Sequence, residues 1–428
     1  MTLTAADRAL LERAIARGRS LLETDLAAVA EGRFGIHESG RLEEERTLAL
    51  PAAERVPRAE LIGVIQHLQG SGLNAKDAVS RLLREAAFTT LNRLVAIRVA
   101  EAIDLLPESL GGGRASRGYR EMLEIFPLLA KDPTGGYWTY LRLCTDELAK
   151  DAPVLFDPRN PLLALEPSAT ALDELAAMFA DPKLGPIWGD AEAFGWTYQY
   201  FNSAAERQKM RDTTAPRNSR ELAVRNQFFT PRYVVDFLVH NTLGRRLLES
   251  SAVSSLAGHL PMLIDSPAHS DSPLDLKQVR VLDPAVGSGH FLLGCYDVLE
   301  LAWKEHGVDA GKAAPLILPC LWGIDIDARC AQVAAAALIL RARRRCRDGN
   351  LPRPHVYTAR PLPPDPSAWE GVLSELDPGA RQLVQRVSEV LGNSPTLGSL
   401  LKVEDALKRE IERYAPAAGG ARRTALRS

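Results

Sequence analysis

The sequence lacks the features that would send a chain into a membrane or through a secretory pathway. It has no apolar run approaching the roughly 20 residues that a bilayer-spanning helix needs. Residues 1–18 carry both charge signs along an amphipathic pattern, without the basic start, apolar core and small-residue cleavage site of a signal peptide. These absences predict a cytoplasmic globular protein with no membrane partner, and 428 residues are enough for two or three domains.

Cysteine is scarce, and its spacing does not suggest a metal site. The five cysteines are scattered, with no Cys-x-x-Cys pair: Cys144, Cys295, Cys320, Cys330 and Cys346. An odd number of isolated cysteines predicts reduced thiols that serve as small apolar residues. We therefore expect no metal centre and no disulfide framework.

A general excess of positive charge is also missing. The net charge is −2, whereas duplex DNA binding usually depends on a basic surface that neutralises phosphates. Positive charge is local, in one group at Arg341, Arg343, Arg344, Arg345 and Arg347 and in another at Arg422, Arg423 and Arg427. For the first group we favour a solvated helix end over a DNA contact, because cations stabilise the C-terminus of a helix.

The first half of the chain predicts helices. In residues 1–215 apolar side chains recur at steps of three and four, as in residues 3–32 and 75–106, so we expect a mostly α-helical N-terminal domain there. The segment 195–201, GWTYQYF, concentrates aromatic residues. We favour packing of this cluster onto a neighbouring domain over stacking on nucleic-acid bases.

The pattern changes after about residue 220. Short apolar runs that end at Asp283 and at 327, and a third at 355–362, alternate with helical segments, which predicts a parallel α/β sheet over residues 216–362. The small, Ser- and Pro-rich residues 251–278 predict a long loop. Residues 363–428 predict a helical insertion or tail.

A compact motif follows the first strand. It reads Asp283-Pro284-Ala285-Val286-Gly287-Ser288-Gly289 and leads directly into a helix. Gly287 and Gly289 can adopt backbone angles that other residues avoid and let a ligand approach the chain closely. The start of the helix offers free N–H groups for a carboxylate, and Asp283 can face an ammonium group. A ligand that carries both groups is an amino acid or an amino-acid-bearing cofactor.

Two other interpretations of this loop compete with that one. A dinucleotide-binding fingerprint needs a third glycine where Leu292 stands, and Asp283 would repel a phosphate. A Walker-type phosphate loop needs a Gly-Lys-Ser/Thr sequence that does not follow. A purely structural strand–turn–helix stays open on this motif alone.

The second strand ends in a further acidic motif, Gly323-Ile324-Asp325-Ile326-Asp327. An acid at the tip of a second parallel strand is placed to accept hydrogen bonds from ribose hydroxyls, which is the role that we expect for Asp325. Ile326 would offer apolar surface to an adenine ring. Asp327 would cap the helix that begins at Ala328.

The chain resembles the gamma-class DNA adenine-N6 methyltransferases. In that class a Thr-Pro segment precedes DPAxGSGxFL, which in turn precedes Gx[DE]ID. Residues 228–231 (FFTP), 283–292 and 323–327 match these elements in that order. The helical N-terminal region is similar to the large, PglX-like methyltransferases of restriction–modification and phage-defence systems.

The resemblance implies a Rossmann-like methyltransferase domain with S-adenosylmethionine as its cofactor and DNA as its partner. Thr230 and Pro231 would line the methionine end of the cofactor, and Asp325 and Ile326 would hold its adenosine. The loop would hold the amino-acid group through Asp283, Pro284, Ala285, Gly287, Ser288 and Gly289. The intact enzyme would transfer a methyl group to adenine after the base is flipped out of the duplex.

The sequence departs from the class at its catalytic motif. No Asn-Pro-Pro-Tyr/Phe sequence occurs, and Ala359 and Arg360 stand where the class has an acid near the adenine. We therefore expect no catalytic residue in this chain, which would be a fragment of a longer enzyme or one half of a split one, and no methyl transfer by the chain alone. The alternatives are a non-catalytic subunit that binds the cofactor or other defence proteins, and a methyltransferase that acts on RNA or protein.

Overall fold

The computed structural model describes residues 3–70, 73–190, 192–201, 208, 212, 230–250, 255–265, 267, 274–359, 373–374, 376–392 and 408. Contacts within the chain divide it into two compact units, Met1–Thr358 and Ala359–Ser428. In the second unit the structure describes one long helix, α18 (Pro378–Gly392), and the helical insertion or tail expected over residues 363–428 stays a prediction. The domain boundary predicted near residue 215 falls among residues 213–229, outside the described ones, and stays a prediction.

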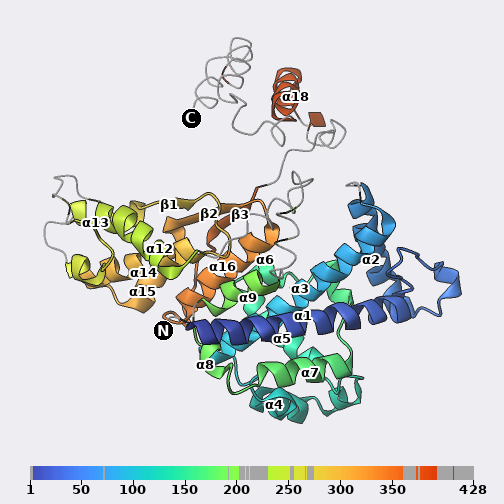
Figure 1. Ribbon diagram of the computed structural model, residues 1–428. Helices are drawn as coiled ribbons and strands as arrows, with labels where there is room; N and C mark the ends of the chain where they lie inside the picture. The colour runs from blue at the N-terminus through green and yellow to red at the C-terminus, as the bar shows by residue number, and fades with distance from the viewer. Residues whose placement is uncertain are drawn as a thin grey trace. The chain divides into compact units, whose positions relative to one another are not determined.

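The N-terminal part of the first unit is helical, as the sequence predicts (Figure 1). Its helices are α1 (Ala5–Phe34), α2 (Ala52–Gly70), α3 (Ala75–Ala102), α4 (Arg117–Ile125), α5 (Tyr137–Ala149), α6 (Pro153–Phe156), α7 (Ala169–Phe179), α8 (Gly185–Trp188) and α9 (Ala193–Phe201). Helix α3 packs against α1, α2, α5 and α9, and buried side chains occur all round it. A helix with buried side chains on every side belongs at the centre of a group of helices.

Three parallel strands form a small sheet in the rest of this unit. Their order is β1 (Val281–Asp283), β2 (Leu321–Asp325) and β3 (His355–Thr358), and Asp283 is in register with Gly323 of β2. The connections run through α14 (His290–Glu305) and α15 (Ala310–Ile317), and then through α16 (Ala328–Arg343). The strands and helices follow one another in the predicted order. The described part of the chain is mostly helical, with a small parallel sheet.

The segment before the sheet contains α12 (Arg232–Val239), a π-helical turn (His240–Gly244) and α13 (Arg245–Ser250). In the predicted loop 251–278, the structure describes two short 3₁₀ turns, Ser255–His259 and Leu276–Gln278. Among the described residues, no helix has the length and apolar character needed to cross a bilayer.

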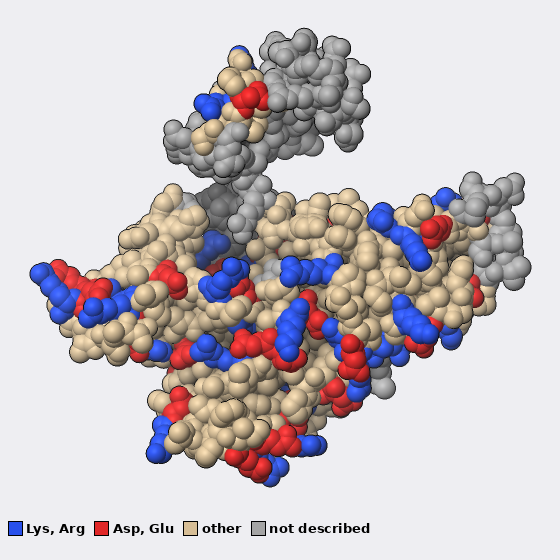
Figure 2. Space-filling model, turned by 180° about the vertical axis from the view of Figure 1, so that it is seen from behind, with Lys and Arg blue, Asp and Glu red and all other residues tan. Residues whose placement is uncertain are grey.

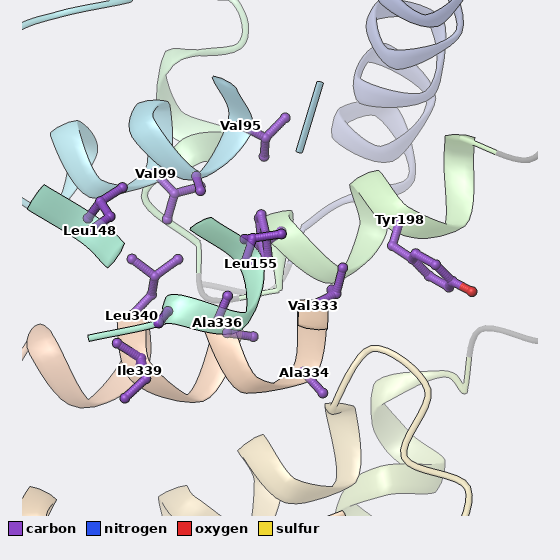
Figure 3. Packing of buried hydrophobic residues seen from close by; sticks show 14 of the residues in the cluster. Val95, Val99, Leu148, Leu155, Tyr198, Val333, Ala334, Ala336, Ile339 and Leu340 are labelled. Carbon is purple, nitrogen blue, oxygen red and sulfur yellow. The ribbon is translucent and has the colours of Figure 1, made fainter. Parts of the chain in front are cut away.

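Helix α16 joins the sheet to the helical region, which is the N-terminal part that contains α1 to α9 (Figure 3). It packs on β2, β3 and α14, and also on α6 and α9. Figure 3 shows Val333 and Leu340 of α16 directed toward Val99 of α3 and Leu155 of α6, while Ala334 points away from them. Its many alanines let neighbouring backbones approach closely on both sides, so one apolar core runs through both parts of the unit.

The arginines at the end of α16 match the expected solvated helix end only in part. Arg344, Arg345 and Arg347 are exposed, whereas Arg341 and Arg343 are largely buried in ion pairs. Arg341 pairs with Asp297 and Glu300, each at 2.8 Å, and Arg343 pairs with Asp151 of the helical region at 2.5 Å. Both arginine side chains are 12% exposed. Arg343 therefore links α16 to the helical part of the unit, while Arg341 links α16 to α14 beside the sheet. Figure 2 shows the two charge signs intermixed on the face it displays.

Candidate functional site

The tips of β1 and β2 bring two predicted acids to one edge of the sheet. Asp283 ends β1 and Asp325 ends β2, and parallel pairing of these strands places both carboxyl ends together. Burial raises the pKa of Asp283 above its ordinary value, a hydrogen bond from the Ala285 amide opposes that shift, and the charge of Asp325 adds to it. The two carboxylates therefore belong to one electrostatic site.

The glycine loop, residues 284–289 between β1 and α14, lies over the end of β2. The Val286 amide donates to the Ile324 carbonyl at 2.9 Å. Gly287 and Gly289 have φ values of +54° and +90°, which other residues adopt at a cost. A Cβ on Gly289 would lie 3.1 Å from the Cα of Ala334 in α16, whereas a Cβ on Gly287 would meet nothing within 4 Å. Gly289 is thus required for packing, and Gly287 faces open space where a ligand can approach.

Asp325 holds this loop in place. Its Oδ2 accepts a hydrogen bond from the Gly287 amide at 2.8 Å, and its Oδ1 accepts one from the Asp327 amide at 2.8 Å. The side chain is buried, with 9% of the residue exposed. A carboxylate has about four acceptor positions, so two remain for hydroxyl groups. Its role toward ribose stays a prediction, to which the structure adds a role in fixing the loop.

Asp283 has a carboxylate oxygen that fits a cationic ligand group. Its Oδ1 accepts the Ala285 amide at 3.1 Å. Its Oδ2 is buried and has no hydrogen-bond partner within the described part of the chain. A buried, ionised oxygen without a partner is costly, and an ammonium group would supply the missing donors. This orphaned atom therefore fits the amino-acid end of a ligand.

The other predicted cofactor contacts lie in the loop after β1, directly after β2 and at the start of α12. Ile326 is 46% exposed directly after β2, as an adenine platform would require. Pro284 and Ala285 are exposed and Ser288 is half-buried, all in the loop itself. Thr230 and Pro231 precede α12, with Pro231 as its N-cap, and their predicted role toward the methionine group stays a prediction.

Helix α12 is packed against the helix that follows the glycine loop. A Cβ on Gly294 of α14 would lie 3.0 Å from Val235 and 3.4 Å from Val239. Arg232 of α12 pairs with Asp236 at 2.7 Å and with Glu192 of the helical region at 3.2 Å. Thr230 and Pro231 therefore begin a helix that lies along α14.

The helical region also reaches the site, through α9. A Cβ on Gly195 would lie 3.1 Å from the His290 ring and 3.3 Å from Ser288 Cβ. The Tyr198 hydroxyl donates to Asp327 Oδ2 at 3.0 Å. These contacts confirm that the aromatic cluster packs onto the neighbouring part. The sequence did not identify that partner as the glycine loop and the turn after β2, and a glycine at the head of an aromatic run was the available signal.

Asp327 caps α16, as predicted. Its Oδ1 accepts the Arg329 amide at 2.9 Å, and its Oδ2 accepts the Arg329 guanidinium at 2.7 Å. Burial alone would raise the pKa of Asp327, but the charge and hydrogen bonds of Arg329 lower it below its ordinary value. Arg329 also lies 3.9 Å from Glu85 of α3 and faces the Phe88 ring at 5.1 Å. Sequence reasoning missed Arg329, because two of its three partners, Glu85 and Phe88, come from α3.

A separate cavity of about 680 Å³ lies at the seam between the helical region and the sheet. Its lining includes Glu192, Arg232, Asp297, Arg344 and Arg347, so both charge signs face it. The burial of Arg344 and the neighbouring charge of Arg341 lower the pKa of Arg344. None of the lining residues comes from the glycine loop, so this cavity is distinct from the site at the strand tips.

Known proteins that resemble the chain are adenine-specific methyltransferases. No family model matches it. It is 27% identical over 290 residues to the adenine-specific methyltransferase BrxX of Escherichia coli O9:H4 (strain HS), which covers 59% of this chain and 24% of that protein. It is 28% identical over 395 residues to the adenine-specific methyltransferase PglX of Lacticaseibacillus casei (strain Zhang), covering 77% of this chain and 31% of that protein. The chain thus spans about a quarter to a third of these relatives.

One solved structure is also similar over most of the chain. It is a nuclease-deletion mutant of the Type ISP restriction-modification enzyme LlaGI in complex with a DNA substrate mimic. The TM-score is 0.32 at 14% sequence identity, and the likeness covers 91% of this chain and 23% of that one. This degree of likeness is too low to carry an argument about fold or function.

Proposed function

We propose that this chain, a homologue of the adenine-specific methyltransferases BrxX and PglX, forms the S-adenosylmethionine-binding part of a Rossmann-like, adenine-specific DNA methyltransferase of a restriction–modification or phage-defence system. The observation that carries the proposal is the orphaned, buried Oδ2 of Asp283, four positions before Gly287, where an added Cβ would meet nothing within 4 Å. A ligand with an ammonium group fits that arrangement, and a phosphate does not.

S-adenosylmethionine supplies an electrophilic methyl group on a positively charged sulfur. In this chain Asp283 would accept hydrogen bonds from the ammonium group, with Thr230 and Pro231 at the methionine end. The first N–H groups of α14, after Gly289, would bind the carboxylate, because the start of a helix has free donors and a positive potential. Asp325 would bind the ribose hydroxyls, and Ile326 would contact the adenine ring.

The methyl acceptor that we propose is adenine in DNA. The printed names of both relatives support that specificity, although the chain matches a third or less of their length. An adenine inside a duplex has to leave the base stack before its amino group can reach a methyl donor. The expected Asn-Pro-Pro-aromatic motif is not in the sequence, so we assign no contact with the target adenine of DNA to a residue of this chain.

Calorimetric titration of the chain with S-adenosylmethionine tests the proposal. We expect saturable one-to-one binding, weakened at least about tenfold by Asp325→Ala, because that change removes two hydrogen bonds from the loop as well as the ribose acceptor. Asp309→Ala is the matched control: Asp309 caps α15 through the Gly311 amide at 2.8 Å, so its loss costs stability and leaves affinity unchanged.

Two results would contradict the proposal. Absence of binding by the folded wild-type chain at millimolar cofactor would remove the site altogether. Equal affinities of Asp325→Ala and Asp309→Ala would show that a bound cofactor lies elsewhere. Titration with a nicotinamide dinucleotide under the same conditions checks the competing interpretation of the glycine loop, and we expect no binding because Asp283 repels the pyrophosphate.

A further inference from the structure

We propose that α9 of the helical region positions the cofactor site, with Gly195 and Tyr198 as its positioning residues. The inference rests on the proposed S-adenosylmethionine site and adds to it a dependence on a helix about 80 residues before the glycine loop along the chain. Two separate contacts carry it: a hydrogen-bonded path that starts at Tyr198, and a close backbone approach at Gly195.

The path from Tyr198 to the glycine loop consists of three hydrogen bonds. The Tyr198 hydroxyl donates to Asp327 Oδ2 at 3.0 Å. The Asp327 amide donates to Asp325 Oδ1 at 2.8 Å, and the Gly287 amide donates to the other oxygen of Asp325 at 2.8 Å. A shift of Asp327 therefore moves the carboxylate that holds the loop, and the same carboxylate is the proposed ribose ligand.

Tyr198 is itself rigidly held. The residue is 4% exposed, its ring meets Phe88 of α3 edge to face at 5.8 Å, and the Cys330 thiol donates to its oxygen at 2.9 Å. Burial, together with the nearby Cys330 and Asp327, raises the pKa of Tyr198 well above its ordinary value. The hydroxyl consequently stays protonated and donates to Asp327 across the physiological pH range.

The second contact is a direct approach of α9 to the loop. A Cβ on Gly195 would lie 3.1 Å from the His290 ring and 3.3 Å from the Cβ of Ser288, closer than such atoms normally pack. His290 begins α14, and its ring faces the edge of Trp196 at 6.4 Å between centroids. Burial and the charge of Arg232 lower the pKa of His290 to about 4, so the ring is neutral at pH 7. The backbone of α9 thus forms a wall behind the glycine loop.

These contacts make the helical region and the cofactor mutually dependent. A change in α9 that displaces the loop weakens the binding of the cofactor. By thermodynamic linkage, the bound cofactor stabilises the contact of α9 with the loop by the same factor. A merely structural contact would behave differently: its loss would lower stability and leave the affinity of the folded protein unchanged.

The test compares pairs of matched variants by calorimetric titration with S-adenosylmethionine. Tyr198→Phe removes the hydroxyl bond to Asp327. Tyr137→Phe removes a buried bond of the same length within the helical region, from its hydroxyl to the Ser109 carbonyl at 3.0 Å. Both changes lower Tm. We expect Tyr198→Phe to raise the Kd about fivefold, because only part of the free energy of a hydrogen bond to a charged group is transmitted to the loop, and Tyr137→Phe to leave the Kd unchanged.

The second pair separates affinity from stability more sharply. Gly195→Ala places a methyl group against His290 and Ser288, whereas Gly63→Ala places one on α2, where nothing lies within 4 Å. Alanine favours both helices over glycine, so neither change needs to unfold the protein. We expect a several-fold higher Kd for Gly195→Ala and a wild-type Kd for Gly63→Ala.

The outcomes distinguish the two proposals. If the wild-type chain does not bind S-adenosylmethionine, the proposed function fails and this inference falls with it. If the wild type binds and Asp325→Ala weakens binding, but Tyr198→Phe and Gly195→Ala match their controls, α9 has no positioning role and the proposed function stands. Should Tyr198→Phe not fold, the Gly195→Ala pair decides the question alone.

Discussion

Replacing Asp283 by asparagine should make the cofactor-free protein more stable and the cofactor-bound protein less so. The buried Oδ2 of Asp283 has no hydrogen-bond partner in the described part of the chain, and burial raises its pKa. Asparagine keeps the shape of the side chain and the acceptor for the Ala285 amide, and it removes the charge. The substitution therefore relieves a desolvation penalty while it deletes the proposed ammonium ligand.

The magnitude follows from the two opposing effects. Asp283→Asn removes an unpaired buried charge and keeps the hydrogen bond from the Ala285 amide, so it should raise the free energy of unfolding by about 1 kcal/mol. In a unit of this size, that gain raises Tm by about 1–2 °C. Wild-type protein in S-adenosylmethionine at 100 times its Kd gains about 2.7 kcal/mol, and the variant gains little of it. The order of the two melting temperatures should therefore reverse when cofactor is added.

The pH dependence has a definite sign. Because the folded state holds the Asp283 proton more tightly than the unfolded chain does, the stability of the wild type falls as pH rises through the window between its unfolded pKa and its raised folded pKa, and is constant above it. The advantage of Asp283→Asn is therefore full at pH 7 and shrinks as pH falls through that window.

Thermal unfolding of both proteins from pH 4.5 to 7.5, with and without cofactor, measures these effects. A variant less stable than wild type at pH 7 without cofactor would refute the unpaired, desolvated carboxylate. Equal stabilisation of both proteins by cofactor would refute the ammonium contact.

The remaining predictions concern packing, charge and thiol reactivity. Gly289→Ala should lower the free energy of unfolding in denaturant by about 2–4 kcal/mol, since it combines a φ of +90° with a close contact on α16. Gly287→Ala, in open space at a φ of +54°, should lower it by about 1 kcal/mol. Equal losses would contradict the packing argument. Arg343→Met should lower the free energy of unfolding by about 2–3 kcal/mol, because it breaks a largely buried ion pair with Asp151. Arg347→Met should lower it by under about 0.5 kcal/mol, because the pair of Arg347 with Asp104 is exposed; equal losses would contradict this difference. Burial raises the pKa of Cys295 to about 12, so its thiol should resist an aromatic disulfide reagent until the protein unfolds, and rapid labelling would count against its burial.

Much of the site could be predicted because it is encoded locally. The acids and glycines from Asp283 to Gly289 lie within seven positions, and Asp325 ends the next strand of the sheet. Alternation of short apolar runs with helical segments then brings the strand ends together. The motif at 283–289 predicted a strand, a turn and a helix, and the motif at 323–327 predicted the cap at Asp327, all from neighbours in the chain.

What escaped prediction depends on contacts between distant residues. Tyr198 and Asp327 are separated by 129 positions, and Arg343 and Asp151 by 192. The arginine group at the end of α16 had the composition of a solvated helix end, and sequence alone gave no means to match its cations with acids in another part of the chain. The same limit applied to the aromatic run around Tyr198, whose packing role was predicted and whose partner was not.

Helix α16 explains why the helical region belongs to the cofactor site. Residues of α16 such as Val333 and Leu340 are buried against the helical region, while Ala334 lies against Gly289 of the loop. A helix that is buried on all sides needs neighbours on all sides, and α6 and α9 of the helical region cover the side of α16 that faces away from the sheet. The first turn of α16, with the Asp327 cap and Arg329, thus lies between the loop and α3. A rearrangement of α3 therefore reaches the strand tips through this helix, and one of α9 reaches them both through this helix and directly at Gly195.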